Sequence, residues 1–147
     1  DSKKLSAKRR EALHDALLDG ALAAGLGWAE PAEIDEVNIL QATFRAMERA
    51  VAALGVVPGA VRIDGNARPP GLPEAQCLVG GDATDPAIAA GSILAKVSRD
   101  RWMADYDDAY PGYGFAGHKG YGTAAHREAI KQLGPSPIHR RSFTIRS

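Results

Sequence analysis

The sequence predicts an α/β fold, and three observations lead to this prediction. Two short apolar runs, residues 60–64 and 75–79, each end in an acidic or glycine-rich turn. Segments on both sides of these runs repeat apolar residues at helical spacing. Strands that alternate with helices are typical of α/β domains. Hydrophobic residues make up 45% and charged residues 24% of the 147 residues, a globular composition that excludes general disorder, a collagen-like repeat and a coiled coil.

The first half of the chain is predicted to be mainly helical. Ser6 is a good N-cap for a helix over residues 7–21. Residues 26–29 are predicted to form a short strand. Pro31 suits the first turn of a helix, and apolar residues recur at helical spacing over residues 39–54, which predicts a helix there.

The second half alternates strands and helices. Trp28 in the first half and Trp102 in this half are the two tryptophans, and both are expected on core faces. The elements expected in this half are a strand over residues 60–64, a Pro/Gly loop over 67–73, a strand over 75–79, a helix over 86–106, a Gly/Tyr-rich loop over 110–122, and a helix capped by Thr123 that ends near residue 133.

The charges are unevenly distributed although the formal net charge is zero. Residues 1–10 and 111–147 are basic, with net charges of +4 and +5, and residues 11–110 carry a net charge of −9. Basic ends suit a polyanion such as nucleic acid, and acidic residues between them suit a metal site; alternatively, the basic ends only aid solubility. The single cysteine fits a reducing compartment, and no run approaches the ~20 apolar residues that span a bilayer.

Two carboxylates follow the predicted strands. Asp64 and Asp82 each come at the end of an apolar strand, beside glycine. Sites in α/β sheets form outside the carboxyl ends of strands, and paired carboxylates there hold hard cations such as Mg²⁺. The alternative is that each aspartate only caps a turn or helix.

Five short motifs occur in order along the chain. They are D-S-K-K-L-S at 1–6, I-D-G-N at 63–66, A-G-S-I-L-A-K-V-S-R-D at 90–100, G-H-K-G-Y-G-T at 117–123 and I-H-R-R-S-F at 138–143. Each is weak alone, but as an ordered set they are specific. The set resembles bacterial type 2 ribonuclease H (ribonuclease HII) over essentially the whole chain.

This resemblance implies an endoribonuclease that cuts the RNA strand of RNA–DNA hybrids and nicks 5′ to single ribonucleotides in duplex DNA, leaving a 3′-hydroxyl and a 5′-phosphate. The family holds Mg²⁺ or Mn²⁺ with four carboxylates, of which Asp64 and Asp82 match the third and fourth. The first two belong to a D-E-A/V-G-R-G-P motif that the family has upstream of D-S-K-K-L, the segment at which this chain begins.

The resemblance also implies a ribonuclease H-like mixed sheet flanked by helices, with strand order 3-2-1-4-5 and the first two strands missing from this chain. We therefore expect residues 1–147 to be a single, N-terminally incomplete domain, with a helical, basic, substrate-binding part at about 111–147. With half of its metal ligands absent, the chain alone is expected to be inactive.

Substrate-binding residues are carried over from the same resemblance. Tyr121 matches the family's reader of the ribonucleotide 2′-hydroxyl, and Lys119, Ser92, Lys3 and Lys4 are candidates for phosphate contact. The alternatives are a surface tyrosine, an ordinary helix residue and solvated lysines.

The sequence leaves two alternatives to an endoribonuclease open. One is a non-catalytic domain that binds RNA–DNA hybrids, and the other is a fragment with no activity of its own. We expect a cytoplasmic monomer that has no membrane partner.

Overall fold

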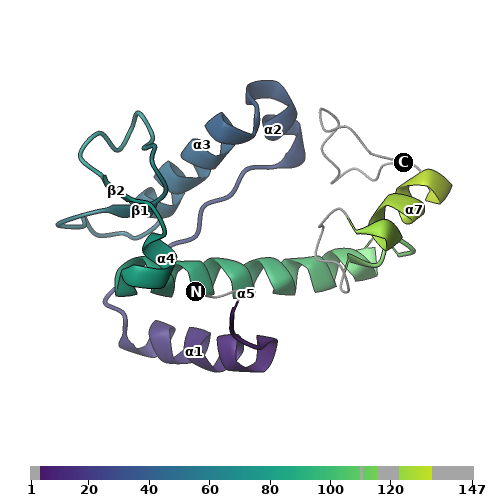
Figure 1. The fold of residues 1–147 in the computed structure, drawn as a ribbon, viewed down its shortest axis with the longest axis horizontal. Helices are drawn as coiled ribbons and strands as arrows, with labels where there is room; N and C mark the ends of the chain where they lie inside the picture. Colours follow the sequence, from purple (N-terminus) through teal and green to yellow (C-terminus); the bar gives the residue numbers. More distant parts are fainter. Residues whose placement is uncertain (1–3, 110, 116–122, 134–147) are drawn as a thin grey trace.

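The computed structural model of the chain describes residues 4–109, 111–115 and 123–133. The long helix α5 runs across the molecule, with α1 packed along one side and the strands, α3 and α2 on the other (Figure 1). The elements are α1 (Ala7–Gly20), α2 (Pro31–Val37), α3 (Ile39–Ala52), β1 (Arg62–Asp64), β2 (Gln76–Leu78), α4 (Gly81–Thr84), α5 (Pro86–Ala109) and α7 (Ala124–Leu133).

Side-chain caps define the helix starts that the sequence predicts. The Ser6 hydroxyl accepts a hydrogen bond from the Arg9 amide at 3.2 Å, and the Thr123 hydroxyl accepts one from the His126 amide at 3.1 Å. These bonds satisfy amides that have no partner within the helix. The predicted helices over 7–21, 39–54, 86–106 and 123–133 are therefore confirmed, with ends that differ by a few residues.

The two strands pair in parallel, with Ile63 opposite Cys77. Ile63 is buried and β1 contacts α5, so the helix covers one face of the sheet. The Gly65 amide donates to the Leu78 carbonyl at 3.0 Å and extends the pairing past Asp64. Both predicted strands are confirmed, and both end at the same edge of the sheet.

The strand predicted over residues 26–29 is wrong, because the structure has extended backbone there but no strand. A strand needs a hydrogen-bonded neighbour, and no residue in the described ranges supplies one. The segment packs on a helix instead. A Cβ atom added to Gly27 would collide with the Ala46 carbonyl and the Ala50 amide of α3, so the glycine allows the backbone to lie directly on that helix.

A buried hydrophobic cluster lies where α5 meets the C-terminal part of the described chain. Met103 of α5 packs there with Phe115 and Ala129, and the rings of Tyr113 and Phe115 stack at 5.3 Å between centroids. The prediction that Trp28 lies on a core face is wrong, because 51% of its surface is exposed. None of the described helices is both long and apolar enough to cross a membrane.

Candidate active site

A backbone turn brings the two predicted carboxylates to the same edge of the sheet. Asp64 ends β1, and its Oδ1 accepts a hydrogen bond from the Gly81 amide at 3.1 Å. Asp82 follows Gly81 directly, in the first turn of α4. Gly80 makes the turn with a φ of 69°, a left-handed conformation that glycine adopts without steric cost. Asp64 and Asp82 therefore lie next to one another although 18 positions separate them in the sequence.

Close packing fixes the position of α4. A Cβ atom on the buried Gly81 would lie 2.6 Å from Cδ1 of Ile88 on α5. An alanine there would require the Ile88 side chain to shift, and Gly81 also supplies the amide that holds Asp64. The geometry at the sheet edge is set by backbone and packing, and one oxygen of Asp64 remains for a ligand beside the one that accepts from Gly81.

The donor set suits a hard cation. The Asp64 side chain is exposed and that of Asp82 is half-buried, and no side chain of the described residues forms an ion pair with either. Carboxylate oxygens are the ligands that Mg²⁺ and Mn²⁺ prefer. Within the described ranges no third Asp, Glu, His or Cys completes a metal-binding cluster. The two residues fit such an ion as part of a larger ligand set.

A third carboxylate nearby has a different role. Oδ1 of Asp85 accepts hydrogen bonds from the amides of Ala87 at 2.9 Å and Ile88 at 3.1 Å, and Oδ2 pairs with Arg62 Nη1 at 3.0 Å. Asp85 therefore caps α5 and ties it to β1, and both of its oxygens are occupied. The Asp85-Pro86 pair is the sequence signal for this cap, since proline favours the first helical position.

The predicted substrate-binding residues are only partly described. Ser92 is half-buried on α5, and Lys4 is exposed just before α1. One turn after Ser92, Lys96 donates to Asp100 at 3.0 Å, so this lysine is held within the fold. Lys3, Lys119 and Tyr121 lie outside the described residues.

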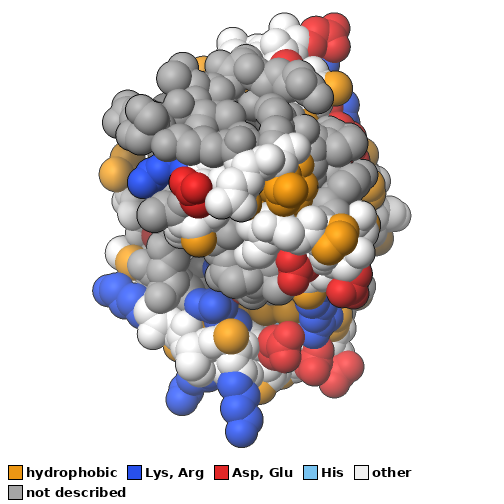
Figure 2. Space-filling view, turned by 90° about the vertical axis from the view of Figure 1, so that its right-hand side faces the viewer, with side chains coloured by type: hydrophobic (Ala, Val, Ile, Leu, Met, Phe, Trp, Pro, Cys, Tyr) orange, Lys and Arg blue, Asp and Glu red, His pale blue; other side chains and the backbone are white. Residues whose placement is uncertain are grey.

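Basic and acidic side chains lie side by side near α1. Figure 2 shows Lys and Arg side chains at the lower end of one face, at the height of α1 in Figure 1, with Asp and Glu side chains beside them. Lys8 and Arg9 are both exposed in the first turn of this helix, where positive charge opposes the helix dipole. Exposed basic groups of this kind suit contact with phosphates.

Parallel strands covered by a long helix, with two carboxylates at their carboxyl edge, define an α/β protein with an acidic site suited to a divalent cation. The chain belongs to the ribonuclease HII family, whose family model matches residues 1–146.

Two relatives show how far this similarity extends. The chain is 52% identical over 143 residues to a ribonuclease HII from Lachnoclostridium phytofermentans. The aligned region covers 97% of this chain and 56% of that protein. The chain therefore spans little more than half the length of this curated relative. The crystal structure of the ribonuclease H2 from Pyrococcus horikoshii OT3 matches 99% of this chain and 76% of that one, with a TM-score of 0.76 and 28% sequence identity. This match confirms the predicted ribonuclease H-like α/β fold.

Proposed function

We propose that the complete protein is a metal-dependent endoribonuclease. It cuts the RNA strand of RNA–DNA hybrids and nicks 5′ to single ribonucleotides in duplex DNA, leaving a 3′-hydroxyl and a 5′-phosphate. The observation that carries this proposal is the hydrogen bond between Asp64 and Gly81, which places Asp64 and Asp82 at one sheet edge in a member of the ribonuclease HII family.

Asp64 and Asp82 would hold Mg²⁺ or Mn²⁺ in this site. Bound there, two such ions would supply activation of the attacking water and charge stabilisation of the leaving oxygen. The Gly81 amide orients Asp64 through one carboxylate oxygen and leaves the other for a ligand. Asp82 adds a second negative charge beside it. Further acidic ligands are needed for two ions, since two carboxylates supply too few oxygens.

Five further residues are proposed to position the substrate. We assign Tyr121 to the ribose 2′-hydroxyl, the group that distinguishes RNA from DNA. We assign Lys119, Ser92, Lys3 and Lys4 to phosphate oxygens, contacts that hold the duplex without reading its sequence. The exposure of Lys4 and the exposed basic residues that follow it on α1 support this assignment.

The remaining proposals concern the chain as a whole. Residues 1–147 form a single domain whose basic part at about 111–147 binds substrate, and the enzyme acts in the cytoplasm as a monomer. The competing function is a non-catalytic domain that binds RNA–DNA hybrids. One observation favours it for this chain alone: the described residues hold only two of the four carboxylates expected for the metal site.

The test compares three 5′-labelled duplexes incubated with the complete protein and Mg²⁺ or Mn²⁺: an RNA–DNA hybrid, a DNA duplex with one ribonucleotide, and an all-DNA duplex. We expect cleavage of the first two, with 3′-hydroxyl ends. Asp82→Asn should abolish it. Asp85→Asn is the matched control and should stay active, because asparagine also caps helices. Full activity of Asp82→Asn, or equal cleavage of the all-DNA duplex, would contradict the proposal.

A further inference from the structure

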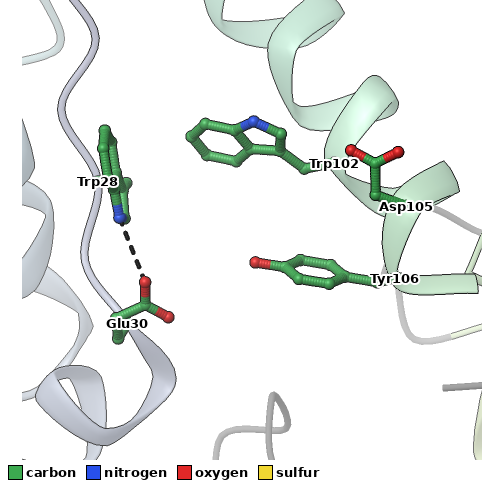
Figure 3. A pocket seen from close by; sticks show the side chains of 5 residues that line it. All are labelled: Trp28, Glu30, Trp102, Asp105 and Tyr106. Carbon is green, nitrogen blue, oxygen red and sulfur yellow. Dashed lines mark hydrogen bonds between the residues drawn. The ribbon is translucent and has the colours of Figure 1, made fainter. Parts of the chain in front are cut away.

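The two long sides of α5 differ in their chemistry. On one side a gap is lined by aromatic and acidic side chains, those of Trp28, Glu30, Trp102, Asp105 and Tyr106 (Figure 3). The expected sheet order places the two strands absent from this chain next to residues 26–29, so these rings are uncovered core faces. The other side of α5 packs against α1 (Figure 1). That interface holds three charged side chains, those of Arg10 on α1 and of Lys96 and Asp100 on α5.

Asp100 joins the two basic side chains of this interface. Its Oδ1 accepts a hydrogen bond from Lys96 Nζ at 3.0 Å, and its Oδ2 pairs with Arg10 Nη2 at 3.7 Å. The Arg10 side chain is only 13% exposed, and the other two are 18% exposed. Charges lose hydration when they are buried, so such pairs add little net stability, and apolar residues of similar size often join helices as well. The three charges therefore call for a reason other than stability.

A second contact of Arg10 supplies this reason. Arg10 Nη1 donates a hydrogen bond to the Leu5 carbonyl at 2.8 Å. Leu5 precedes Ser6, the N-cap of α1, so its carbonyl lies outside the hydrogen-bond ladder of that helix. The guanidinium therefore holds the backbone before α1 with one nitrogen and pairs with Asp100 of α5 through another. A planar guanidinium suits a double contact of this kind because its nitrogens are fixed relative to one another.

The Leu5 contact lies between two residues assigned above to phosphate oxygens. Lys4 comes directly before Leu5 and has an exposed side chain, and Ser92 lies about two helical turns before Asp100 on α5. A lysine side chain is long and flexible, so a fixed backbone at its base limits where its ammonium group can reach. Arg10 and Asp100 thus connect the backbone beside Lys4 to the helix that carries Ser92.

We propose that Arg10 is a positioning residue for substrate binding. Through the Leu5 carbonyl and Asp100 it fixes on α5 the backbone that directly follows Lys3 and Lys4 in the sequence. The proposal rests on the proposed function, since it takes these two lysines as phosphate contacts. Arg10 itself is given no contact with the substrate, because its side chain is largely buried between the two helices.

The test measures binding of the complete protein to a fluorescein-labelled RNA–DNA hybrid by anisotropy, over a range of salt concentrations and without divalent metal. Arg10→Gln should weaken binding about fivefold. It should also reduce the slope of log K against log salt by about 1, as the loss of one phosphate contact does. Arg10→Lys keeps the positive charge but has one nitrogen for two partners, so it should weaken binding about twofold.

Two comparisons separate positioning from a general effect on the fold. Arg101→Gln is the matched control, because Arg101 of α5 also pairs with α1, at 3.8 Å from Glu11, and it should leave the affinity and the salt slope unchanged. In a protein that already carries Lys3→Gln and Lys4→Gln, Arg10→Gln should weaken binding by no more than about 1.5-fold, since residues that act through one contact are not additive.

Equal effects of Arg10→Gln and Arg101→Gln, or the full fivefold loss in the protein without the two lysines, would overturn the proposal. If urea unfolding shows that Arg10→Gln does not fold, Arg10→Lys decides, and wild-type affinity in that variant would overturn it. Cleavage is judged separately. A protein that cuts the hybrid but responds equally to both arginine variants refutes this proposal alone, and one that shows the Arg10 effect but cuts no duplex refutes the nuclease function alone.

Discussion

Gly27→Ala should destabilise the protein through one backbone contact. A Cβ atom at position 27 would overlap the Ala46 carbonyl and the Ala50 amide, and it would lie 3.0 Å from the Arg49 carbonyl carbon. Backbone atoms of a helix cannot rotate away, so the extended segment must move outward by about 1 Å or more to reach van der Waals separation. This shift strains the hydrogen bond between Arg49 Nη1 and the Trp28 carbonyl.

The expected loss of stability is about 1–3.5 kcal/mol. Overpacking of this kind costs about 1–3 kcal/mol, and loss of a hydrogen bond from a charged donor adds about 1 kcal/mol at a half-exposed site. Alanine reduces the freedom of the unfolded chain and recovers about 0.4–1 kcal/mol. The backbone φ at Gly27 is outside the left-handed region, so the cost comes from the contact alone.

Urea unfolding of the complete protein, followed by circular dichroism, measures this change. Gly59→Ala is the matched control, because nothing lies within 4 Å of its added Cβ atom, and its stability should stay within about 0.5 kcal/mol of the wild type. A Gly27→Ala variant as stable as the Gly59→Ala variant would refute the packing of this segment on α3.

Three further predictions concern substrate choice, pH and the isolated chain. Tyr121→Ala in the complete protein should slow incision at a single ribonucleotide more than it weakens binding to all-DNA duplex, because only the ribose contact is lost; equal losses in gel-shift and incision assays would show a structural role. Hydrogen bonds from Arg49 and Arg45 lower the pKa of Glu33 from 4.5 to about 2, so the ionised carboxylate stabilises the fold and Glu33→Gln should lower the free energy of unfolding at neutral pH. This loss should shrink as the pH falls from about 4.5 towards 2, because the wild-type carboxylate is then protonated. A loss of unfolding free energy that stays constant over this pH range in urea unfolding would contradict the prediction. Residues 1–147 alone should not hydrolyse an embedded ribonucleotide, and any duplex binding should fall steeply with salt; turnover that Asp82→Asn abolishes would refute this.

Local signals in the sequence were sufficient for most elements of the fold. The caps at Ser6 and Thr123 act within one helical turn, and the apolar spacing that predicts α3 depends only on helix geometry. The strand predicted over residues 26–29 failed because strand formation needs a neighbour from elsewhere in the chain. Trp28 was misplaced for the same reason, since its burial depends on what packs against that segment.

The candidate site shows a similar limit. Asp64, Asp82 and Asp85 all follow or flank apolar segments. Their sequence contexts therefore do not tell an aspartate that binds a metal ion from one that caps a helix or turn. The structure separates them by their partners: Asp85 uses both oxygens within the fold, whereas Asp64 uses one. The resemblance to ribonuclease HII selects Asp64 and Asp82 as metal ligands, and that choice stays a prediction.

The central claim is that Asp64 and Asp82 hold a divalent metal ion at the carboxyl edge of the sheet. Titration of the complete protein with Mn²⁺, with free ion followed by electron paramagnetic resonance, tests it most directly. We predict that Asp64→Asn, which keeps an oxygen to accept the Gly81 amide, weakens Mn²⁺ binding about tenfold or more, while Asp85→Asn leaves it unchanged. Equal Mn²⁺ affinity in wild type and Asp64→Asn, or an equal loss in both variants, would contradict the claim.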